Sequence, residues 1–364
     1  MSNAVYKPLS SIILVLVLSA CANTPSTPDN LYASREFPKP QPASKLIQPK
    51  PKNTYTAPVT SPSEDAYSYS DSNYAQRFEV QSFIQLMVQE HGFSRSYLMG
   101  LFSEAKQLPS VIRLETGSDH SPGPPKPRLG SWTRYRANFL TEEHIRHGVE
   151  FWTSNAAAIQ KASNTYGVDP EYIVGIIGVE TYFGRNIGKT CVFDALTTLA
   201  FDTQRRAPYF RTELEHFLLM TREEGYQPRK LVGSWAGAMG LGQFMPSSFR
   251  RLAVDFDRNG KRDLWQPHDA IGSVAHYFSK NGWQFNSPVA ELSYANADKS
   301  TIDLSTYEGD EYWQTFPNFK VIKRYNNSKK YAMAVHQLAQ AIKGRLPLSQ
   351  SFTGARVTSS TFTH

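Results

Sequence analysis

Cysteine is scarce in this chain of 364 residues, which contains only Cys21 and Cys191. The sequence also lacks zinc-finger spacings, a phosphate-binding glycine loop, a compact basic run and any internal repeat. A net charge of +7 therefore does not by itself indicate nucleic acid, because it suits anionic membranes and carboxylate-bearing partners equally well. After the first 20 residues, no stretch is long and apolar enough to cross a membrane.

The N-terminus is the one strongly apolar part of the sequence. Residues 9–20, LSSIILVLVLSA, have the length of a signal peptide and end at Cys21 in the small-residue pattern of a bacterial lipobox. We expect residues 1–20 to be removed and Cys21 to be lipidated, which anchors a protein without a spanning helix. Residue 22 is Ala rather than Asp, which predicts the periplasmic face of the bacterial outer membrane. Cys191 then has no disulfide partner, and we expect a small buried hydrophobe rather than a nucleophile.

Residues 21–76 follow the lipobox and are rich in proline, as in FPKPQP and QPKPK. Such a composition cannot bury enough apolar surface to offset the entropy of ordering. We predict a disordered tether with a reach on the order of 150 Å when stretched.

From residue 77 onward, apolar residues recur at helical spacing, and the fold class predicted is mainly α, of the α+β type. Between Val289 and Val321 the pattern changes to short runs and turns, which indicates a few strands. The helices that we expect are Phe78–His91, Arg95–Leu108, Trp132–Phe139, Thr141–Lys161, Ala195–Glu224 and Tyr331–Ile342.

The stretch Asp169–Arg185, DPEYIVGIIGVETYFGR, is apolar almost all round, which is typical of a buried helix. Asp169 is placed to cap its start, and Gly184 is a natural stop. Glu180 is a lone carboxylate at its end, and burial would keep such a group protonated to higher pH, as a glycosidase acid requires. The alternative is that Glu180 turns to solvent or pairs with Arg185.

Residues 233–248, GSWAGAMGLGQFMPSS, contain four glycines within ten positions, which lets the backbone lie close to a ligand or another element. Gln243 is the only amide side chain among them and is suited to a polar group such as a sugar N-acetyl. The alternative is a glycine-rich turn that leads into a helix starting at Pro246.

Residues 255–263, DFDRNGKRD, reproduce the front half of an EF-hand calcium loop, with oxygen-bearing side chains at alternate places and Gly260 at the sixth. The twelfth place holds Gln266 instead of Glu, so Asp269 is the nearest carboxylate able to close the site. A bound cation would be structural, and a metal-free Asp/Asn turn is the alternative. The predicted ligands are Asp255, Asp257, Asn259, Lys261 through its carbonyl, and Asp269.

Taken together, these stretches resemble the third family of lytic transglycosylases in its membrane-bound lipoprotein form. The resemblance runs from about Phe78 to Leu346 and rests on WTRYRANFLT, VGIIGVETYFGR, DALTTLAFDTQRRAPYF, GSWAGAMGLGQFMPSS, AVDFDRNG, DAIGSVAHYF and RYNNSKKYAMAV. It implies a lysozyme-like core with a helical N-terminal domain and a small β-containing insertion. The domains that we expect after the tether are a helical domain (77–165), a catalytic core with the EF-hand-like loop (166–288), a β-containing region (289–324), a helix returning to the core (325–346) and a polar tail (347–364).

The resemblance also assigns residues. Glu180 matches the family's single catalytic acid, while Tyr182 and Phe183 depart from the Arg-Trp of the best-known member. Asn259 stands where that member has Asp. Residues matching positions that contact the glycan are Ser234, Gln243, Tyr277, Asn326 and Tyr331, and a pair associated with the stem peptide is matched by Arg205 and Arg206.

The implied reaction is cleavage of the β-1,4 bond between N-acetylmuramic acid and N-acetylglucosamine in peptidoglycan. Glu180 would act first as acid and then as base, the muramoyl C6 hydroxyl would close onto C1, and 1,6-anhydro ends would form. We identify no second catalytic carboxylate in the sequence, which fits assistance by the substrate's own N-acetyl group. No catalytic cofactor is expected, and the expected partners are glycan strands, stem peptides and a membrane, but not nucleic acid. The alternatives are a hydrolytic muramidase and a non-catalytic peptidoglycan-binding lipoprotein.

Overall fold

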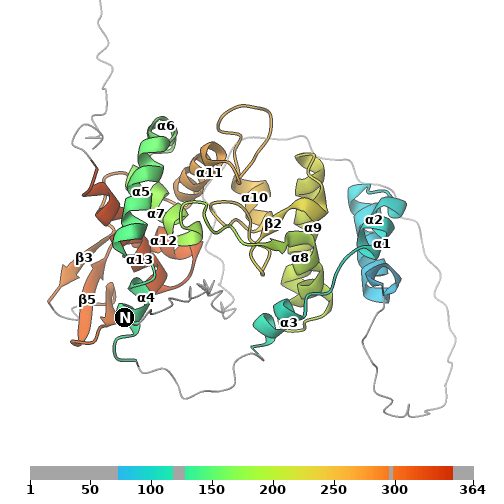
Figure 1. Cartoon of the computed structure of the whole chain (residues 1–364), viewed down its shortest axis with the longest axis horizontal. Coiled ribbons are helices and arrows are strands. Elements are labelled where there is room, and N and C mark those ends of the chain that lie inside the picture. The colour runs from blue at the N-terminus through green and yellow to red at the C-terminus, as the bar shows by residue number, and fades with distance from the viewer. Residues whose placement is uncertain (1–72, 118–127, 295–297, 347–364) are drawn as a thin grey trace, which may run out of the picture. The chain divides into compact units, whose positions relative to one another are not determined.

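A computed structural model describes residues 73–117, 128–294 and 298–346 of the chain. The predicted signal peptide, Cys21, the tether and the polar tail lie outside the described residues. Within these ranges, no helix combines the length and the apolar character that crossing a bilayer requires. The helices are α1 (Phe78–His91), α2 (Arg95–Ser103), α3 (Pro109–Thr116), α4 (Ser131–Arg136), α5 (Glu142–Ser154), α6 (Ala156–Tyr166), α7 (Pro170–Thr181), α8 (Val192–Phe201), α9 (Ala207–Glu223), α10 (Pro246–Leu252), α11 (Pro267–Lys280), α12 (Pro317–Tyr325) and α13 (Lys329–Lys343), with short 3₁₀ helices at Tyr74–Gln76 and Pro228–Lys230 (Figure 1).

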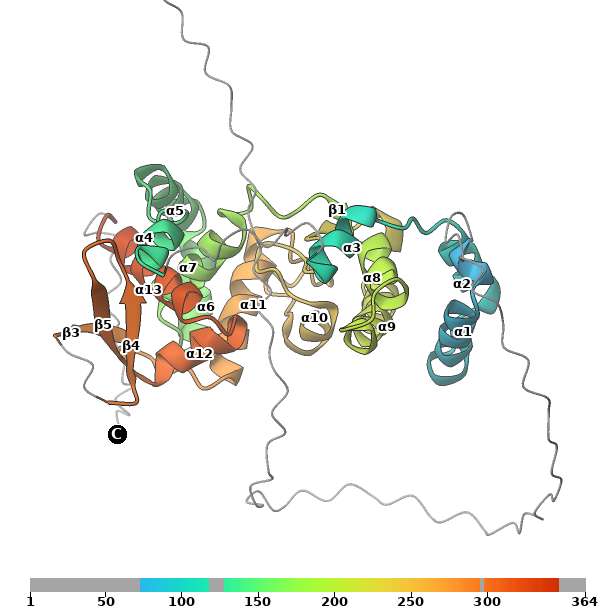
Figure 2. The same ribbon diagram turned by 90° about the horizontal axis from the view of Figure 1, so that it is seen from below.

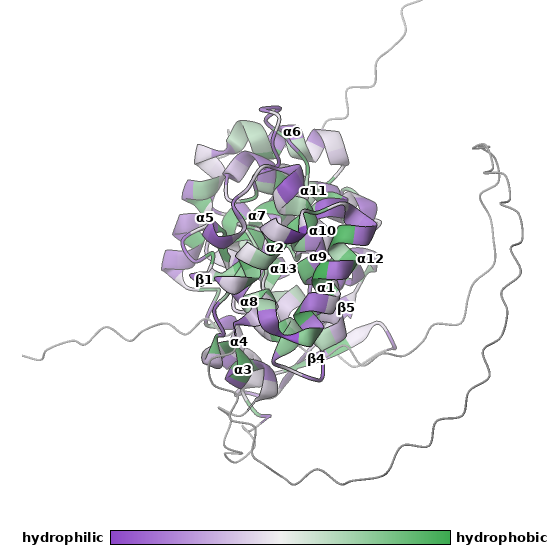
Figure 3. Ribbon diagram, turned by 90° about the vertical axis from the view of Figure 1, so that its right-hand side faces the viewer, coloured by the Kyte–Doolittle hydropathy of each residue, from purple (hydrophilic) through white to green (hydrophobic). Residues whose placement is uncertain are grey.

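Helix α7 is the apolar helix predicted from the sequence, and its residues from Glu171 to Val179 are all buried. It packs along α13, and α5, α6 and α11 also contact it. Gly175 permits the close approach of α13, because a Cβ atom there would lie 3.1 Å from the carbonyl oxygen of Val335. Figure 3 shows green apolar residues on α7 and purple polar residues along the outer side of α5.

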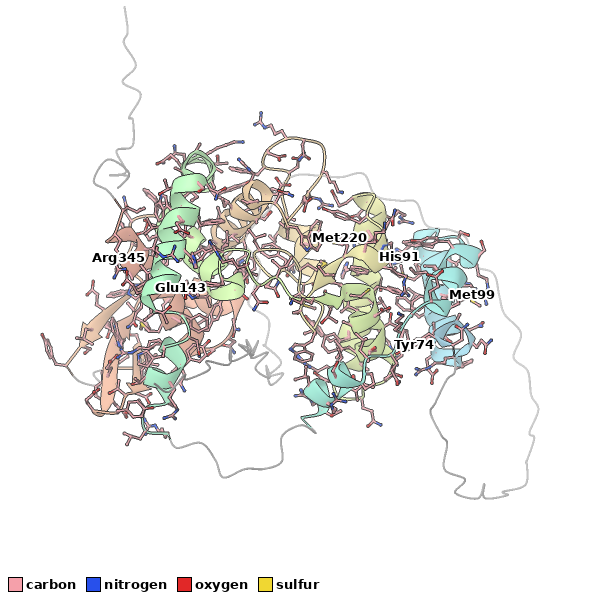
Figure 4. The ribbon with its side chains drawn as sticks, in the orientation of Figure 1. Tyr74, His91, Met99, Glu143, Met220 and Arg345 are labelled. Atoms are coloured by element: carbon pink, nitrogen blue, oxygen red, sulfur yellow. The ribbon has the colours of Figure 1, made fainter. Side chains whose placement is uncertain are left out.

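A second group of packed helices is formed by α8, α9 and α10, and α3 contacts α8. The N-terminal helices join this group through polar contacts of Tyr74 and His91, both labelled in Figure 4. The Tyr74 hydroxyl donates to Asp202, and His91 Nε2 lies 2.9 Å from Glu215 Oε1. Contacts between Phe83, Phe102 and Phe201 complete the apolar side of this junction.

The expected strands are present as a three-stranded antiparallel sheet of β3 (Ala290–Ser293), β4 (Thr301–Ser305) and β5 (Asp310–Thr315), with β5 in the middle (Figure 2). The register pairs Leu292 and Ile302 with Trp313. A two-stranded pair, β1 (Thr190–Cys191) and β2 (Val232–Gly233), ties the chain after α7 to the glycine-rich segment. Burial raises the pKa of Cys191 in this pair, which disfavours a nucleophilic thiolate.

Four expected helices are shorter or broken. The helix expected over Trp132–Phe139 ends at Arg136. The helix expected over Thr141–Lys161 breaks at Asn155, whose side-chain amide donates to the Phe151 carbonyl and so favours a helix end. The helix expected over Ala195–Glu224 breaks at residues 202–206, where Asp202 turns to bond Arg77 at 2.6 Å. The helix expected to reach Leu108 ends at Ser103.

The start of α7 also differs in detail. Asp169 occupies the N-cap position, but its side chain makes no capping hydrogen bond. Its carboxylate instead accepts from the indole of Trp283 at 2.7 Å and from the backbone N–H of Asn286 at 3.1 Å. A distant partner has therefore replaced the local cap.

The domain boundaries remain a proposal, which the helix contacts refine. Helix α3 packs on α8, whereas α5 and α6 pack on α7 and α4 packs on β4. We therefore propose that residues 77–165 form two parts that pack against different helices. Residues 77–117 lie beside α8 and α9, and residues 128–165 lie beside α7.

Candidate active site

The C-terminal end of α7 is an unusual helix stop that presents Glu180. The helix ends at Thr181, and Tyr182 and Phe183 both adopt left-handed backbone, with φ of 52° and 57°, before the expected Gly184. Non-glycine residues rarely take this conformation, and two in succession are held by the surrounding structure. The Thr181 hydroxyl contributes by accepting from the Gly184 N–H at 3.1 Å and donating to the Leu241 carbonyl at 2.9 Å.

Glu180 is partly reached by solvent, yet its carboxyl group is surrounded by protein atoms. This burial raises the pKa of Glu180 to about 7, while a hydrogen bond from Tyr331 opposes the rise. The Tyr331 hydroxyl donates to Glu180 Oε1 at 2.5 Å. Arg185, the alternative partner, instead lies 3.5 Å from Glu150 Oε2. Glu180 therefore has the protonation behaviour of a general acid near neutral pH.

Tyrosines form the surroundings of this carboxyl group. The charge of Glu180 contributes to raising the pKa of Tyr331, Tyr325 and Tyr135, in each case after burial. The Tyr277 ring lies 4.6 Å from that of Tyr325, measured between centroids. Glu180 thus lies among neutral, hydrogen-bonding side chains. The sequence predicted Tyr331 and Tyr277 among them.

No second carboxylate acts on Glu180 in the described part of the chain. Burial and the Tyr331 hydrogen bond are the influences on its pKa, and no acidic neighbour contributes. A retaining or inverting glycosidase needs two carboxyl groups facing the scissile bond. The pKa of Glu180 therefore carries no influence from an acidic partner among the described residues, and a single-acid mechanism stays a proposal.

The glycine-rich segment is held against the end of α7. The carbonyl of Leu241 accepts from Thr181, and the carbonyl of Gly242 accepts from the Tyr325 hydroxyl at 2.6 Å. Gln243 follows with a left-handed φ of 51°, and its amide donates to the Gly240 carbonyl at 2.9 Å. Gln243 therefore directly follows two residues that are bonded to Thr181, next to Glu180 in the chain, and to Tyr325.

Ser234 lies at the start of the same segment and is buried. Its hydroxyl accepts from the Ala238 N–H at 3.0 Å, which closes the turn that precedes Gln243. The expected helix at Pro246 is α10. Asn326 is half-buried at the C-terminal end of α12, directly after Tyr325. Both positions are compatible with the predicted contacts to a glycan.

Arg205 and Arg206 are placed differently from the residues around Glu180. Both contact the buried Glu115 of α3: Arg206 Nε donates to Oε1 at 2.8 Å, and Arg205 lies 3.4 Å from the same oxygen. The Arg206 guanidinium also lies over the Phe210 ring at 4.9 Å. This pair therefore joins α3 to the start of α9, and no contact of the described residues brings it to Glu180.

The predicted calcium loop has its carboxylates together. One oxygen from each of Asp255, Asp257 and Asp269 lies within 4.8 Å of the others. Asp269 is buried and accepts backbone N–H groups from Phe256 at 2.7 Å and Asp263 at 2.7 Å. Burial raises the pKa of Asp269, and the charge of Asp257 adds to this rise.

The rest of the loop fits the same oxygen cage. Gly260 has φ of 89°, the sharp turn that the pattern requires. Asn259 accepts from the Lys261 N–H at 3.0 Å, and Gln266 is the N-cap of α11 without a side-chain capping bond. An oxygen-only donor set with one buried carboxylate suits a hard cation such as Ca²⁺.

Sequence reasoning missed Tyr325 and Tyr135 as neighbours of Glu180, although both lie within motifs that carry the resemblance. It also missed Glu115 as the partner of the arginine pair. An aromatic residue in a helix is most often core, so the sequence offered no signal that separates a cleft tyrosine from a packed one.

Comparisons with known proteins agree with this geometry. A family model described as "Transglycosylase SLT domain" matches residues 75–303 and 290–340. Membrane-bound lytic murein transglycosylase B of Escherichia coli K12 is 44% identical over 303 residues, covering 74% of this chain and 84% of the relative.

Solved structures show the same fold. The lytic transglycosylase Slt35 of Escherichia coli in complex with calcium has a TM-score of 0.69 at 44% identity, covering 74% of this chain and 94% of that chain. SltB3 of Pseudomonas aeruginosa in complex with NAG-anhNAM-pentapeptide has a TM-score of 0.63 at 27% identity, covering 75% and 83%. The expected mainly α, lysozyme-like fold is therefore confirmed. The chain belongs to the SLT-domain lytic transglycosylases and is an enzyme that acts on peptidoglycan.

Proposed function

We propose that Glu180 is the only acid/base group of the lytic transglycosylase reaction in this chain. The observation that carries the proposal is a carboxyl group enclosed by protein atoms, with the Tyr331 hydroxyl bonded to Oε1 and a pKa raised by burial to about 7. Protonated Glu180 gives its proton to the glycosidic oxygen as the bond from muramoyl C1 breaks. The N-acetyl oxygen of the same sugar stabilises the positive charge that develops at C1.

The second step returns the proton. Glu180, now a carboxylate, takes the proton of the muramoyl C6 hydroxyl, and the C6 oxygen bonds to C1 as the N-acetyl oxygen leaves. The products are a 1,6-anhydro end and a free 4-hydroxyl on the departing N-acetylglucosamine, and no water is consumed. The atoms balance without a cofactor.

Tyr331 supports this cycle as a positioning residue. Its hydroxyl binds Glu180 Oε1, which leaves Oε2 to carry the proton that moves. The bond also stabilises the carboxylate that exists between the two steps. Without it, the pKa of Glu180 would rise further and the second step would have a less stable starting state.

The sugar contacts are proposed on the same geometry. Gln243 and Ser234 lie in the segment held between Thr181 and Tyr325, and Asn326 follows Tyr325 directly. Tyr277 adds an aromatic ring beside Tyr325, which suits stacking on a sugar face.

Digestion of purified sacculi tests the reaction itself. We expect muropeptides that end in 1,6-anhydro-N-acetylmuramic acid, each lighter by one water than the hydrolysed product, in mass spectra of the digest. Reducing ends would instead support a muramidase that delivers water to C1. An absence of soluble products would support the non-catalytic peptidoglycan-binding alternative.

We propose further that the loop at residues 255–269 binds a structural calcium ion through Asp255, Asp257, Asn259, the Lys261 carbonyl and Asp269. The clustered carboxylates support this, and the related Slt35 was solved with calcium. At calcium a hundred times above its Kd, we expect about 2.7 kcal/mol of stabilisation and a rise in Tm of roughly 5–10 °C.

Thermal denaturation with and without chelator measures this rise. Asp257→Ala should abolish it, whereas Asp298→Ala, at an exposed carboxylate of another loop, should retain it. An equal calcium response in both variants, or none in the wild type, would contradict the metal proposal.

We propose that Cys21 carries a lipid that anchors the enzyme at the outer membrane. The lipobox sequence supports this, and the Escherichia coli relative is named as membrane-bound. Labelling with a fatty acid in cells should mark the protein, and Cys21→Ser should remove both the label and its presence in the membrane fraction. If the variant keeps the fatty-acid label or stays in the membrane fraction, the proposed lipid anchor is wrong.

The stem-peptide role of Arg205 and Arg206 also stays a proposal. Their shared bond to Glu115 neutralises one of the two positive charges. The bond also holds the two guanidinium groups side by side at the start of α9.

A further inference from the structure

Helix α12 carries a basic surface that the reaction does not use. An open depression of about 380 Å³ is lined by Lys320, Lys323, Arg324 and Asn327, which we call the basic depression. Lys323 and Arg324 lie three and four positions after Lys320, so the three cations share one face of the helix. Asn327 adds an amide at the end of that face.

The charges of the basic depression are not balanced by acids. No acidic side chain lines it, and in the described part of the chain its three cations make no ion pair. Arg324 makes one neutral bond, from Nη1 to the Asn281 carbonyl at 2.6 Å. Lys323 and Arg324 lie in the last turn of α12, where the helix dipole favours cations, but both also repel Lys320, which is three and four positions earlier.

Helix α12 connects the basic depression to the residues around Glu180. Helix α12 ends at Tyr325, whose hydroxyl binds the Gly242 carbonyl of the glycine-rich segment. Arg324, together with the exposed Arg251 of α10, acts electrostatically on Tyr277, whose ring lies 4.6 Å from that of Tyr325. An anion held by α12 would therefore lie beside a glycan bound at Glu180.

We infer that the basic depression binds the free carboxylates of a peptidoglycan stem peptide whose glycan occupies the cleft, an inference that rests on the proposed function. A stem peptide offers several carboxylates together with peptide amides, which match the three cations and the Asn327 amide. A lipid surface fits less well, because all three cations lie on one short helix, α12, instead of covering a broad face.

The role differs from that of the arginine pair. Arg205 and Arg206 share one buried carboxylate, so part of their charge is used within the fold. The cations of the basic depression have no such partner among the described residues. The basic depression therefore presents more uncompensated positive charge to a ligand.

Binding of two soluble ligands to the full chain tests the inference. The first is the disaccharide N-acetylglucosaminyl-N-acetylmuramic acid with its pentapeptide, and the second is the same disaccharide with the lactyl group capped as a simple amide. Neither contains the scissile bond, so wild-type protein can be titrated calorimetrically. We expect the peptide-bearing ligand to bind about 10-fold more tightly, with this preference shrinking as salt screens the charges.

Lys320→Gln combined with Lys323→Gln and Arg324→Gln should remove most of this preference and leave only the part that Arg205 and Arg206 supply. The like-charge repulsion that is relieved and the favourable interaction with the helix dipole that is lost oppose each other, so a Tm close to that of the wild type should show that this triple variant folds. The matched control removes three exposed cations elsewhere, Arg95→Gln with Lys106→Gln and Lys299→Gln, and should keep the 10-fold preference.

A folded triple variant that keeps the preference would overturn the inference, as would a wild type without one. If the triple variant loses binding to phosphatidylglycerol vesicles while keeping its peptide preference, the occupant is a lipid surface and the inference is wrong. These binding results are independent of bond cleavage. A sacculus digest without anhydro ends would remove the proposed reaction and leave the affinity ratio interpretable.

Discussion

Replacing Glu180 by glutamine is expected to lower kcat on peptidoglycan by on the order of 10⁴-fold, because one group serves both proton transfers. Glutamine is nearly isosteric but has no proton to give to the glycosidic oxygen and no carboxylate to accept the C6 proton. Release of 1,6-anhydro muropeptides from purified sacculi, followed by chromatography and mass spectrometry, measures the loss. A single-acid mechanism predicts that no remaining carboxylate in the cleft restores the rate.

The fold of the variant provides the control. The folded-state pKa of Glu180, about 7, lies above its ordinary value of 4.5. Its contribution to stability is therefore fully present below pH 4.5 and is lost as pH rises through 7. Glu180→Gln cannot ionise and should be at least as stable as the wild type at pH 8.

A matched variant separates chemistry from charge. Glu90→Gln on α1 removes an exposed carboxylate far along the chain and should keep full activity. Retention of activity within tenfold of wild type by Glu180→Gln would overturn the assignment of Glu180. Equal losses in both variants would do the same.

The pH–rate profile is expected to fall about 50-fold between pH 7 and pH 9, since only the protonated fraction of Glu180 can donate. Burial sets this limb by raising the pKa of Glu180 to about 7. The measurement is kcat/KM on a soluble glycan strand across pH 5 to 10. A rate that stays flat from pH 6 to 9 would show that Glu180 is not the group that titrates.

Tyr331→Phe is expected to shift the alkaline limb of the pH–rate profile. The Tyr331 hydrogen bond favours the carboxylate and lowers the pKa of Glu180, so its removal should move the alkaline limb to higher pH. The matched control is Tyr135→Phe, because Tyr135 senses the charge of Glu180 but no hydrogen bond joins them. We expect the control to leave the limb in place. A shift to lower pH in Tyr331→Phe would contradict the proposed role of the hydrogen bond.

Local sequence features predicted those elements whose physics is local. The apolar α7, the strands after residue 289 and the alternating oxygens of the calcium loop each depend on neighbouring residues in the chain. Helix ends were predicted less well. Asn155 and Asp202 broke two expected helices because their side chains found partners that a periodic pattern does not reveal.

The candidate site likewise has features that the sequence predicted and features that it did not reveal. The sequence predicted Glu180, and its departure at Tyr182 and Phe183 from the family's Arg-Trp was visible before the structure. It did not reveal that both residues would adopt left-handed backbone. It also did not reveal that Thr181, beside them, would bond Leu241, 60 residues later.

By itself, the sequence predicted a side chain for proton transfer and a loop with the oxygens that calcium prefers, since both predictions rest on residue type, short-range spacing and the resemblance of the surrounding motifs. Only the tertiary structure decided the pKa of that acid and the residues that face it. Glu180 reaches a pKa of about 7 through burial, opposed by the hydroxyl of Tyr331, 151 residues away. Desolvation and a long-range hydrogen bond are properties of packed elements, and no local pattern contains them.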